Sequence, residues 1–137
     1  GLLLGWTSVT NEITMLPFIL YVGAIFWTLG FDTIYGFQDI KDDEIIGLKS
    51  TSIKFKSNPY KFLIICYSIF LVSLLIIGFL LKLNPIYFII LVIVALQMYY
   101  FQIYKLDIKK MNSCLNIFKS NNFLGLLIFT SLFIGKI

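Results

Sequence analysis

The sequence predicts an all-α protein: a polytopic transmembrane helix bundle with about four spans and a partial one before them. Hydrophobic residues make up 59% of the chain and charged residues only 13%, whereas soluble domains contain roughly 25% charged residues. The apolar residues form long unbroken runs, as membrane-spanning helices require, rather than the alternating pattern of half-buried strands. The lipid bilayer is therefore the expected environment of the chain.

Four segments come near the roughly 20 apolar residues that a helix needs to cross the hydrocarbon of a bilayer. Asn58 with Pro59, and Asn84 with Pro85, supply the caps and first-turn prolines that begin two of these spans. Residues 120–122 are expected to cap the last one. The whole chain, residues 1–137, is thus expected to be a single transmembrane domain. The expected spans are about 15–36, 59–81, 85–104 and a short one at 123–137, preceded at 2–10 by the tail of an earlier helix.

Lysines predict the orientation of the bundle. Successive spans alternate in direction, so residues 37–61 and 105–120 share one side, and nine of the eleven basic residues lie there. By the positive-inside rule this side, including a loop at 37–58, faces the cytoplasm of a bacterial inner membrane, or the matrix if the membrane is mitochondrial. The chain has no arginine, so we expect no nucleic-acid partner. Cys66 and Cys114 fit neither a disulfide framework nor a zinc site and are expected to be plain thiols.

Acidic residues are concentrated at the mouth of the first complete span, where residues 32–44 hold five of the seven carboxylates. If that helix continues past Gly36, Asp39 and Asp43 lie one turn apart on one face, with Asp32 on almost the same stripe. Like charges at this spacing repel and require a compensating cation. Mg²⁺ prefers oxygen ligands and is usually held by one or two carboxylates with substrate phosphates. The pattern therefore suggests a magnesium site for a membrane substrate that bears a diphosphate.

Each of these residues also has a simpler interpretation, because D-x-x-x-D is a weak pattern and loop carboxylates are often only solvated. Gly47 is expected to end the helix, so that Lys49 and the hydroxyls of residues 50–52 return toward the carboxylates, as a phosphate site would require. Lys49 is equally explained by contact with anionic lipid headgroups. Tyr35 is expected either to bind a substrate or to belong to an interfacial aromatic belt. A cation transporter or channel fragment with an acidic vestibule is a competing function.

The stretch DTIYGFQDIKDDEIIGLKSTS, residues 32–52, resembles the second aspartate-rich motif of the UbiA superfamily of membrane prenyltransferases. Within that superfamily it is most similar to the branch that prenylates 4-hydroxybenzoate in ubiquinone biosynthesis. The motif pieces D-T-x-Y, Q-D-x-x-D-D and I-G-x-K-S-T occur in this order, and the match to the family motif needs no insertion or deletion. CLNIFKSNNFLGLLIF, residues 114–129, also resembles the last loop and helix of this branch. The resemblance covers essentially the whole chain and implies a nine-span helical bundle, of which this chain is the later half.

The resemblance also implies a reaction, the transfer of a polyprenyl group from polyprenyl diphosphate to the ring of 4-hydroxybenzoate. It implies that Asp39 and Asp43 are catalytic residues that bind Mg²⁺, and that Asp32, Tyr35 and Lys49 occupy substrate-binding positions. Other members of the superfamily act on different acceptors, which remains an alternative. The family's first aspartate-rich motif is absent from these residues, and the chain opens without methionine. We therefore expect the C-terminal portion of a longer enzyme, inactive by itself.

Overall fold

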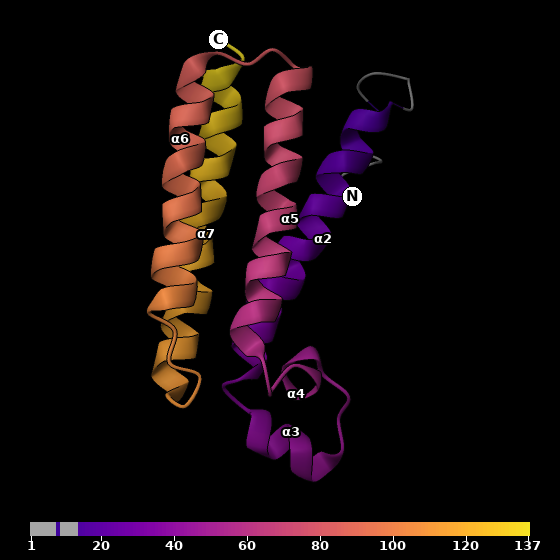
Figure 1. Cartoon of the computed structure of the whole chain (residues 1–137), viewed down its shortest axis with the longest axis vertical. Coiled ribbons are helices and arrows are strands. Elements are labelled where there is room, and N and C mark those ends of the chain that lie inside the picture. The colour runs from indigo at the N-terminus through magenta and orange to yellow at the C-terminus, as the bar shows by residue number, and fades with distance from the viewer. Residues whose placement is uncertain (1–7, 9–13) are drawn as a thin grey trace.

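The computed structural model describes residue 8 and residues 14–137, and every regular element in this part of the chain is a helix (Figure 1). The helical tail predicted at residues 2–10 falls almost entirely outside the described residues. Four helical segments of 20 to 25 residues are long and apolar enough to span a membrane, which confirms the predicted fold class. The elements are α2 (Met15–Gly36), α3 (Ile40–Ile46), α4 (Thr51–Lys54), α5 (Pro59–Leu80), α6 (Pro85–Leu96), the π-helix η1 (Gln97–Tyr104) and α7 (Met111–Gly135).

The long helices form two packed pairs, α2 with α5 and α6 with α7, and α2 also packs on α7. Figure 1 shows that α3, α4 and the η1–α7 loop lie at one end of the bundle. The α5–α6 connection and the C-terminus lie at the other end. The two lysine-rich loops therefore share one end, as the alternating topology predicts.

The α5–α6 hairpin forms where Asn84 and Pro85 predict it. The Asn84 side chain accepts a hydrogen bond of 3.2 Å from the backbone N–H of Tyr87 and so caps α6. The backbone N–H of Asn84 donates to the carbonyl of Gly135 at 3.0 Å, which ties the hairpin to the end of α7. The cap of α5 differs from the prediction, because Asn58 precedes Pro59 at the N-cap position but its side chain makes no capping bond.

The first complete span, α2, has the predicted bounds and ends at Gly36, so the condition that this helix continues into the acidic cluster is not met. Residues 37–39 form a turn, and α3 is a separate helix. The short helix α4 packs across the end of α2, where the hydroxyls of Thr33 and Thr51 lie 2.7 Å apart. A side chain at Gly36 would overlap Ser52, so glycine permits this close approach. Asp32 on α2 therefore does not share a helical stripe with Asp39 and the carboxylates of α3.

Helix α7 begins at Met111, so the prediction of a short last span that starts at 123 is wrong. Residues 120–122, expected as a cap, lie inside this helix. Their polar groups find partners there: the Ser120 hydroxyl donates to the carbonyl of Ile117 at 2.6 Å. The Asn121 side chain is buried and hydrogen-bonded to other helices. Low hydropathy in this segment reflects interior polar contacts rather than a helix end.

A buried polar network joins all four spans. The Trp27 indole N–H and Nε2 of Gln102 both donate to Oδ1 of Asn121, each at 3.1 Å. The Tyr67 hydroxyl donates to Oε1 of Gln102 at 2.6 Å. Gln102 is fully buried, as predicted for a polar group that faces the bundle interior, whereas Gln97 is only partly buried. Because hydrocarbon offers no hydrogen bonds, these contacts stabilise one relative arrangement of the helices.

Candidate functional site

Asp39 and Asp43 lie one helical turn apart at the start of α3. Asp39 is the N-cap residue, and its carbonyl accepts the backbone N–H groups of Asp42 and Asp43, each at 3.0 Å. Its carboxylate makes no capping hydrogen bond. Within the described residues neither Asp39 nor Asp43 forms an ion pair with a lysine. The start of α3 therefore presents two carboxylates that no lysine of the described residues neutralises.

Gly47 ends α3 as predicted, with a left-handed φ of 77° that other residues rarely adopt. Lys49 follows it, is exposed, and has no carboxylate partner in the part of the chain that the structure describes. In the described part of the chain the hydroxyls of residues 50–52 make no hydrogen bond to a carboxylate, contrary to the expectation. Ser50 instead caps α4 by accepting the N–H of Ile53 at 3.4 Å, and Thr51 contacts α2.

Asp32 and Tyr35, the other two candidate residues, lie on the last turns of α2 and are exposed. The ring of Tyr35 packs against Phe118 of α7, with centroids 4.7 Å apart. The structure thus brings Tyr35 to the α2–α7 boundary rather than to α3. The substrate-binding roles of Asp32, Tyr35 and Lys49 stay predictions.

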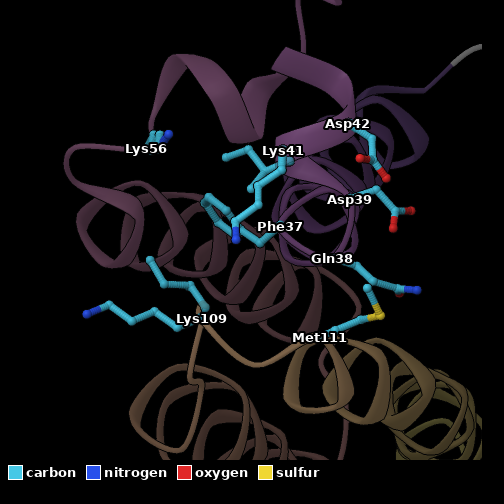
Figure 2. Close-up of a pocket in the computed structure, with 10 residues that line it drawn as sticks. Phe37, Gln38, Asp39, Lys41, Asp42, Lys56, Lys109 and Met111 are labelled. Carbon is cyan, nitrogen blue, oxygen red and sulfur yellow. The ribbon is translucent and has the colours of Figure 1, made fainter. Parts of the chain in front are cut away.

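A cavity of about 680 Å³ opens beside Asp39. Its walls come from the α2–α3 turn, the start of α3, the segment before α5, the η1–α7 loop and the start of α7. Figure 2 shows the carboxylates of Asp39 and Asp42 on one side of the view and the side chains of Lys41, Lys56 and Lys109 on the other. Asp43, Asp32, Tyr35 and Lys49 do not line it. The lining residues are Phe37, Gln38, Asp39, Ile40, Lys41, Asp42, Lys56, Ile108, Lys109 and Met111.

Asp39 is the one polar residue of this cavity that the sequence predicted as a site residue; the others, which were missed, are Gln38, Lys41, Asp42, Lys56 and Lys109. Oε1 of Gln38 is buried and accepts no hydrogen bond in the described part of the chain. Lys109 comes from a loop far along the sequence. The one sequence feature that pointed to Lys109 was the prediction that residues 37–61 and 105–120 share one side of the membrane. The fold places both loops at the same end of the bundle.

The η1–α7 loop is organised by Asp107. Its Oδ1 accepts the backbone N–H of Lys109 at 3.1 Å, and its Oδ2 lies 3.2 Å from Nζ of Lys110. These two contacts, the backbone hydrogen bond first, hold the pKa of the Asp107 carboxyl below its ordinary value. The Asp107 N–H in turn donates to the hydroxyl of Ser113 at 3.1 Å. Contacts of Asp107 with Lys109 and Lys110 on one side and with Ser113 of α7 on the other therefore hold the η1–α7 loop in place.

The fit of the site to Mg²⁺ can be judged from its donors. Residue 8 and residues 14–137 contain no group of three or more acidic, cysteine or histidine side chains able to hold a metal ion. Mg²⁺ is usually bound by one or two carboxylates and completes its shell with water and phosphate oxygens. Asp39 and Asp43 match that smaller requirement. The two carboxylates are thus compatible in kind with Mg²⁺, and a magnesium site here stays a prediction.

Fold and site together define a polytopic helical membrane protein with an acidic motif at one end of its bundle. The model of the UbiA prenyltransferase family matches residues 1–131. The chain therefore belongs to the UbiA prenyltransferase family.

Curated relatives are similar over nearly the whole chain. A mitochondrial 4-hydroxybenzoate polyprenyltransferase from Bos taurus is 38% identical over 140 residues, which cover 100% of this chain and 37% of the relative. A 4-hydroxybenzoate octaprenyltransferase from Psychromonas ingrahamii is 33% identical over 141 residues, 98% of this chain and 49% of the relative. The chain thus spans less than half the length of these relatives. No solved structure matches it significantly.

Proposed function

We propose that this chain is part of an enzyme that transfers a polyprenyl group from polyprenyl diphosphate to the ring of 4-hydroxybenzoate, in ubiquinone biosynthesis. The observation that carries the proposal is similarity along essentially the whole chain to relatives whose names specify 4-hydroxybenzoate as the acceptor. Because the chain covers less than half of those relatives, the activity belongs to a longer protein of which this is one portion.

In the proposed reaction the bond between the prenyl carbon and the diphosphate oxygen breaks, and diphosphate leaves with the bonding electrons. A carbon–carbon bond forms at the ring position next to the phenol hydroxyl, and the ring then loses a proton. Asp39 and Asp43 would hold Mg²⁺ at the α2–α3 turn. When bound, Mg²⁺ neutralises charge that develops on the leaving diphosphate.

The chain's own residues would bind and orient the substrates. Lys49 is exposed and unpaired in the described structure, so its ammonium is free to bind phosphate oxygens as a point charge. Asp32 and Tyr35, on the last turns of α2, are proposed to contact substrate at the membrane end of the same site. The apolar spans provide a path for the prenyl chain and exclude water from the reacting carbon.

The membrane assignment follows from the same features. Four apolar helices support an integral membrane protein. We place the acidic motif on the cytoplasmic face of a bacterial inner membrane, or on the matrix side in mitochondria, because both lysine-rich loops lie at that end. Family membership disfavours the transporter alternative. A different aromatic acceptor within the same family remains the competing assignment.

The test uses membranes that contain the full-length protein, incubated with a polyprenyl diphosphate and radiolabelled 4-hydroxybenzoate. We expect prenylated product in the presence of Mg²⁺ and none after chelation with EDTA. Product that forms only with another aromatic acceptor would move the protein to a different branch of the family. Absence of product with every acceptor, in membranes where the protein is folded and abundant, would contradict prenyl transfer itself.

A further inference from the structure

The η1–α7 loop contributes a wall to the cavity beside Asp39, although it lies about seventy positions further along the sequence. Ile108 packs against the hydrophobic core and also lines the cavity. Lys109 follows at the rim. The anchoring of Ile108 and the backbone bond from Lys109 to Asp107 therefore fix the position from which the Lys109 side chain extends.

The lysines of this end of the bundle differ in their partners. Nζ of Lys56 lies 2.7 Å from Oε1 of Glu44, and Lys110 pairs with Asp107. Lys41 and Lys109 line the same cavity but have no carboxylate within ion-pair distance among the described residues. These two ammonium groups are thus available to a ligand.

The walls of the cavity are largely apolar. Phe37, Ile40, Ile108 and Met111 form apolar walls of the cavity, and the exposed side chains of Lys41 and Lys109 lie at its rim. Two unpaired cations beside such walls favour an anionic ligand, and lysine binds phosphate and carboxylate oxygens as a point charge. The buried Oε1 of Gln38, which lacks a donor in the described residues, adds an acceptor for the phenol hydroxyl in the case of 4-hydroxybenzoate.

We propose that Lys41 and Lys109 form an oxyanion-binding subsite across the cavity from Asp39 (Figure 2). Its ligand is the anionic group of a substrate, either a diphosphate or an aromatic carboxylate. The proposal rests on the proposed function, because it assigns this group to one of the two substrates of that reaction. It makes the η1–α7 loop part of the substrate site, so that bound substrate connects this loop to the α2–α3 turn.

The first test measures the accessibility of individual lysines in the full-length protein in detergent. An amine-acylating reagent is applied with inorganic diphosphate, with 4-hydroxybenzoate or with neither, and each lysine is quantified by mass spectrometry. We expect one of the two anions to slow acylation of Lys41 and Lys109 severalfold. Lys105 is the internal control: it lies in the same loop, 5.0 Å from the ring centroid of Tyr100, and does not line the cavity. Protection by neither anion, or equal protection of Lys105, would overturn the proposal.

The second test measures the kinetics of Lys41→Gln, Lys109→Gln and the control Lys105→Gln. Loss of a charged hydrogen-bond donor should raise KM for the protecting substrate by roughly 10-fold or more and leave kcat largely unchanged. A KM that stays at the wild-type value in both cavity variants, while wild-type transfer is intact, would remove the subsite and leave the proposed function standing. Conversely, protection of Lys41 and Lys109 in a protein that catalyses no prenyl transfer would support the subsite and contradict the proposed function, because the acylation measurement requires no turnover.

Discussion

The Tyr67 hydroxyl donates a hydrogen bond of 2.6 Å to Oε1 of Gln102, between two side chains that are both fully buried and 35 residues apart. Gln102 belongs to the π-helix η1, and π-helical turns within helices occur frequently at functional sites. Through Asn121 the same network reaches α7 and α2. The relative positions of the four spans, and with them the α2–α3 turn, depend on this network.

Replacing Tyr67 with phenylalanine should destabilise the protein by about 1 kcal/mol, because Oε1 of Gln102 loses its donor in an apolar interior. Tyr99→Phe is the matched control, since the Tyr99 hydroxyl pairs with Ser68 at a partly exposed position. Thermal unfolding of the full-length protein in detergent measures both. An equal loss of stability in the two variants would show that the buried hydrogen bond contributes no more than the partly exposed one.

Asn121→Ala should be more severe, because it leaves two donors, the Trp27 indole and Nε2 of Gln102, without their acceptor. We expect a loss of about 2 to 3 kcal/mol in the free energy of unfolding. The neighbouring Asn122 is exposed, and Asn122→Ala should cost less than about 0.5 kcal/mol. Denaturant unfolding in detergent compares them, and an Asn122 variant as unstable as the Asn121 variant would contradict the network.

Gly30→Ala tests the close contact of α2 with α5. A Cβ at Gly30 would overlap the ring of Tyr67, so the two helices must separate, at a cost of about 1 to 3 kcal/mol. At Gly125 the nearest atom to an added Cβ, on Trp27, lies 3.5 Å away, an ordinary contact. Gly125→Ala should therefore be tolerated. Unfolding temperatures that fall equally, or not at all, would show that α2 and α5 pack less closely than described.

Protonation of Asp107 should loosen the η1–α7 loop. Its pKa in the folded protein is lower than the ordinary value of 3.8, chiefly because the Lys109 N–H bonds to it. A depressed folded-state pKa means that the contribution to stability is complete above the ordinary value and is lost as pH falls through the folded-state pKa. NMR of the Lys109 amide in detergent should show one transition below pH 3.8, absent in Asp107→Asn. A transition at or above that pH would contradict the assignment.

Hydropathy predicted most of the fold, because the length of an apolar run is set by the thickness of the bilayer and needs no tertiary information. It failed at α7, where residues 111–122 are too polar to be recognised as part of a span. Only the folded bundle shows that Asn121 meets Trp27 and Gln102 there. The π-helical geometry of η1 likewise has no periodic signature in the sequence.

The candidate site was predicted in part. The spacing of Asp39 and Asp43 survives, because α3 keeps them one turn apart. The end of α2 at Gly36 was predicted, but the packing of α4 against that end through Thr33 and Thr51 was not, because a contact between separate helices leaves no local pattern. Lys109 was also missed as a cavity residue, because a contact between distant loops leaves no local pattern.

The central claim is that Asp39 and Asp43 bind the Mg²⁺ on which prenyl transfer depends. The most direct measurement is the rate of transfer to 4-hydroxybenzoate as a function of Mg²⁺ concentration, for the full-length protein and for Asp39→Asn, Asp43→Asn and Glu44→Gln. We predict a loss of about 100-fold or more in each aspartate variant, because charge on the leaving group is no longer neutralised. Glu44→Gln removes a carboxylate of the same helix that pairs with Lys56 and should stay within about threefold of wild type. Aspartate variants that retain the wild-type rate and magnesium dependence would contradict the claim.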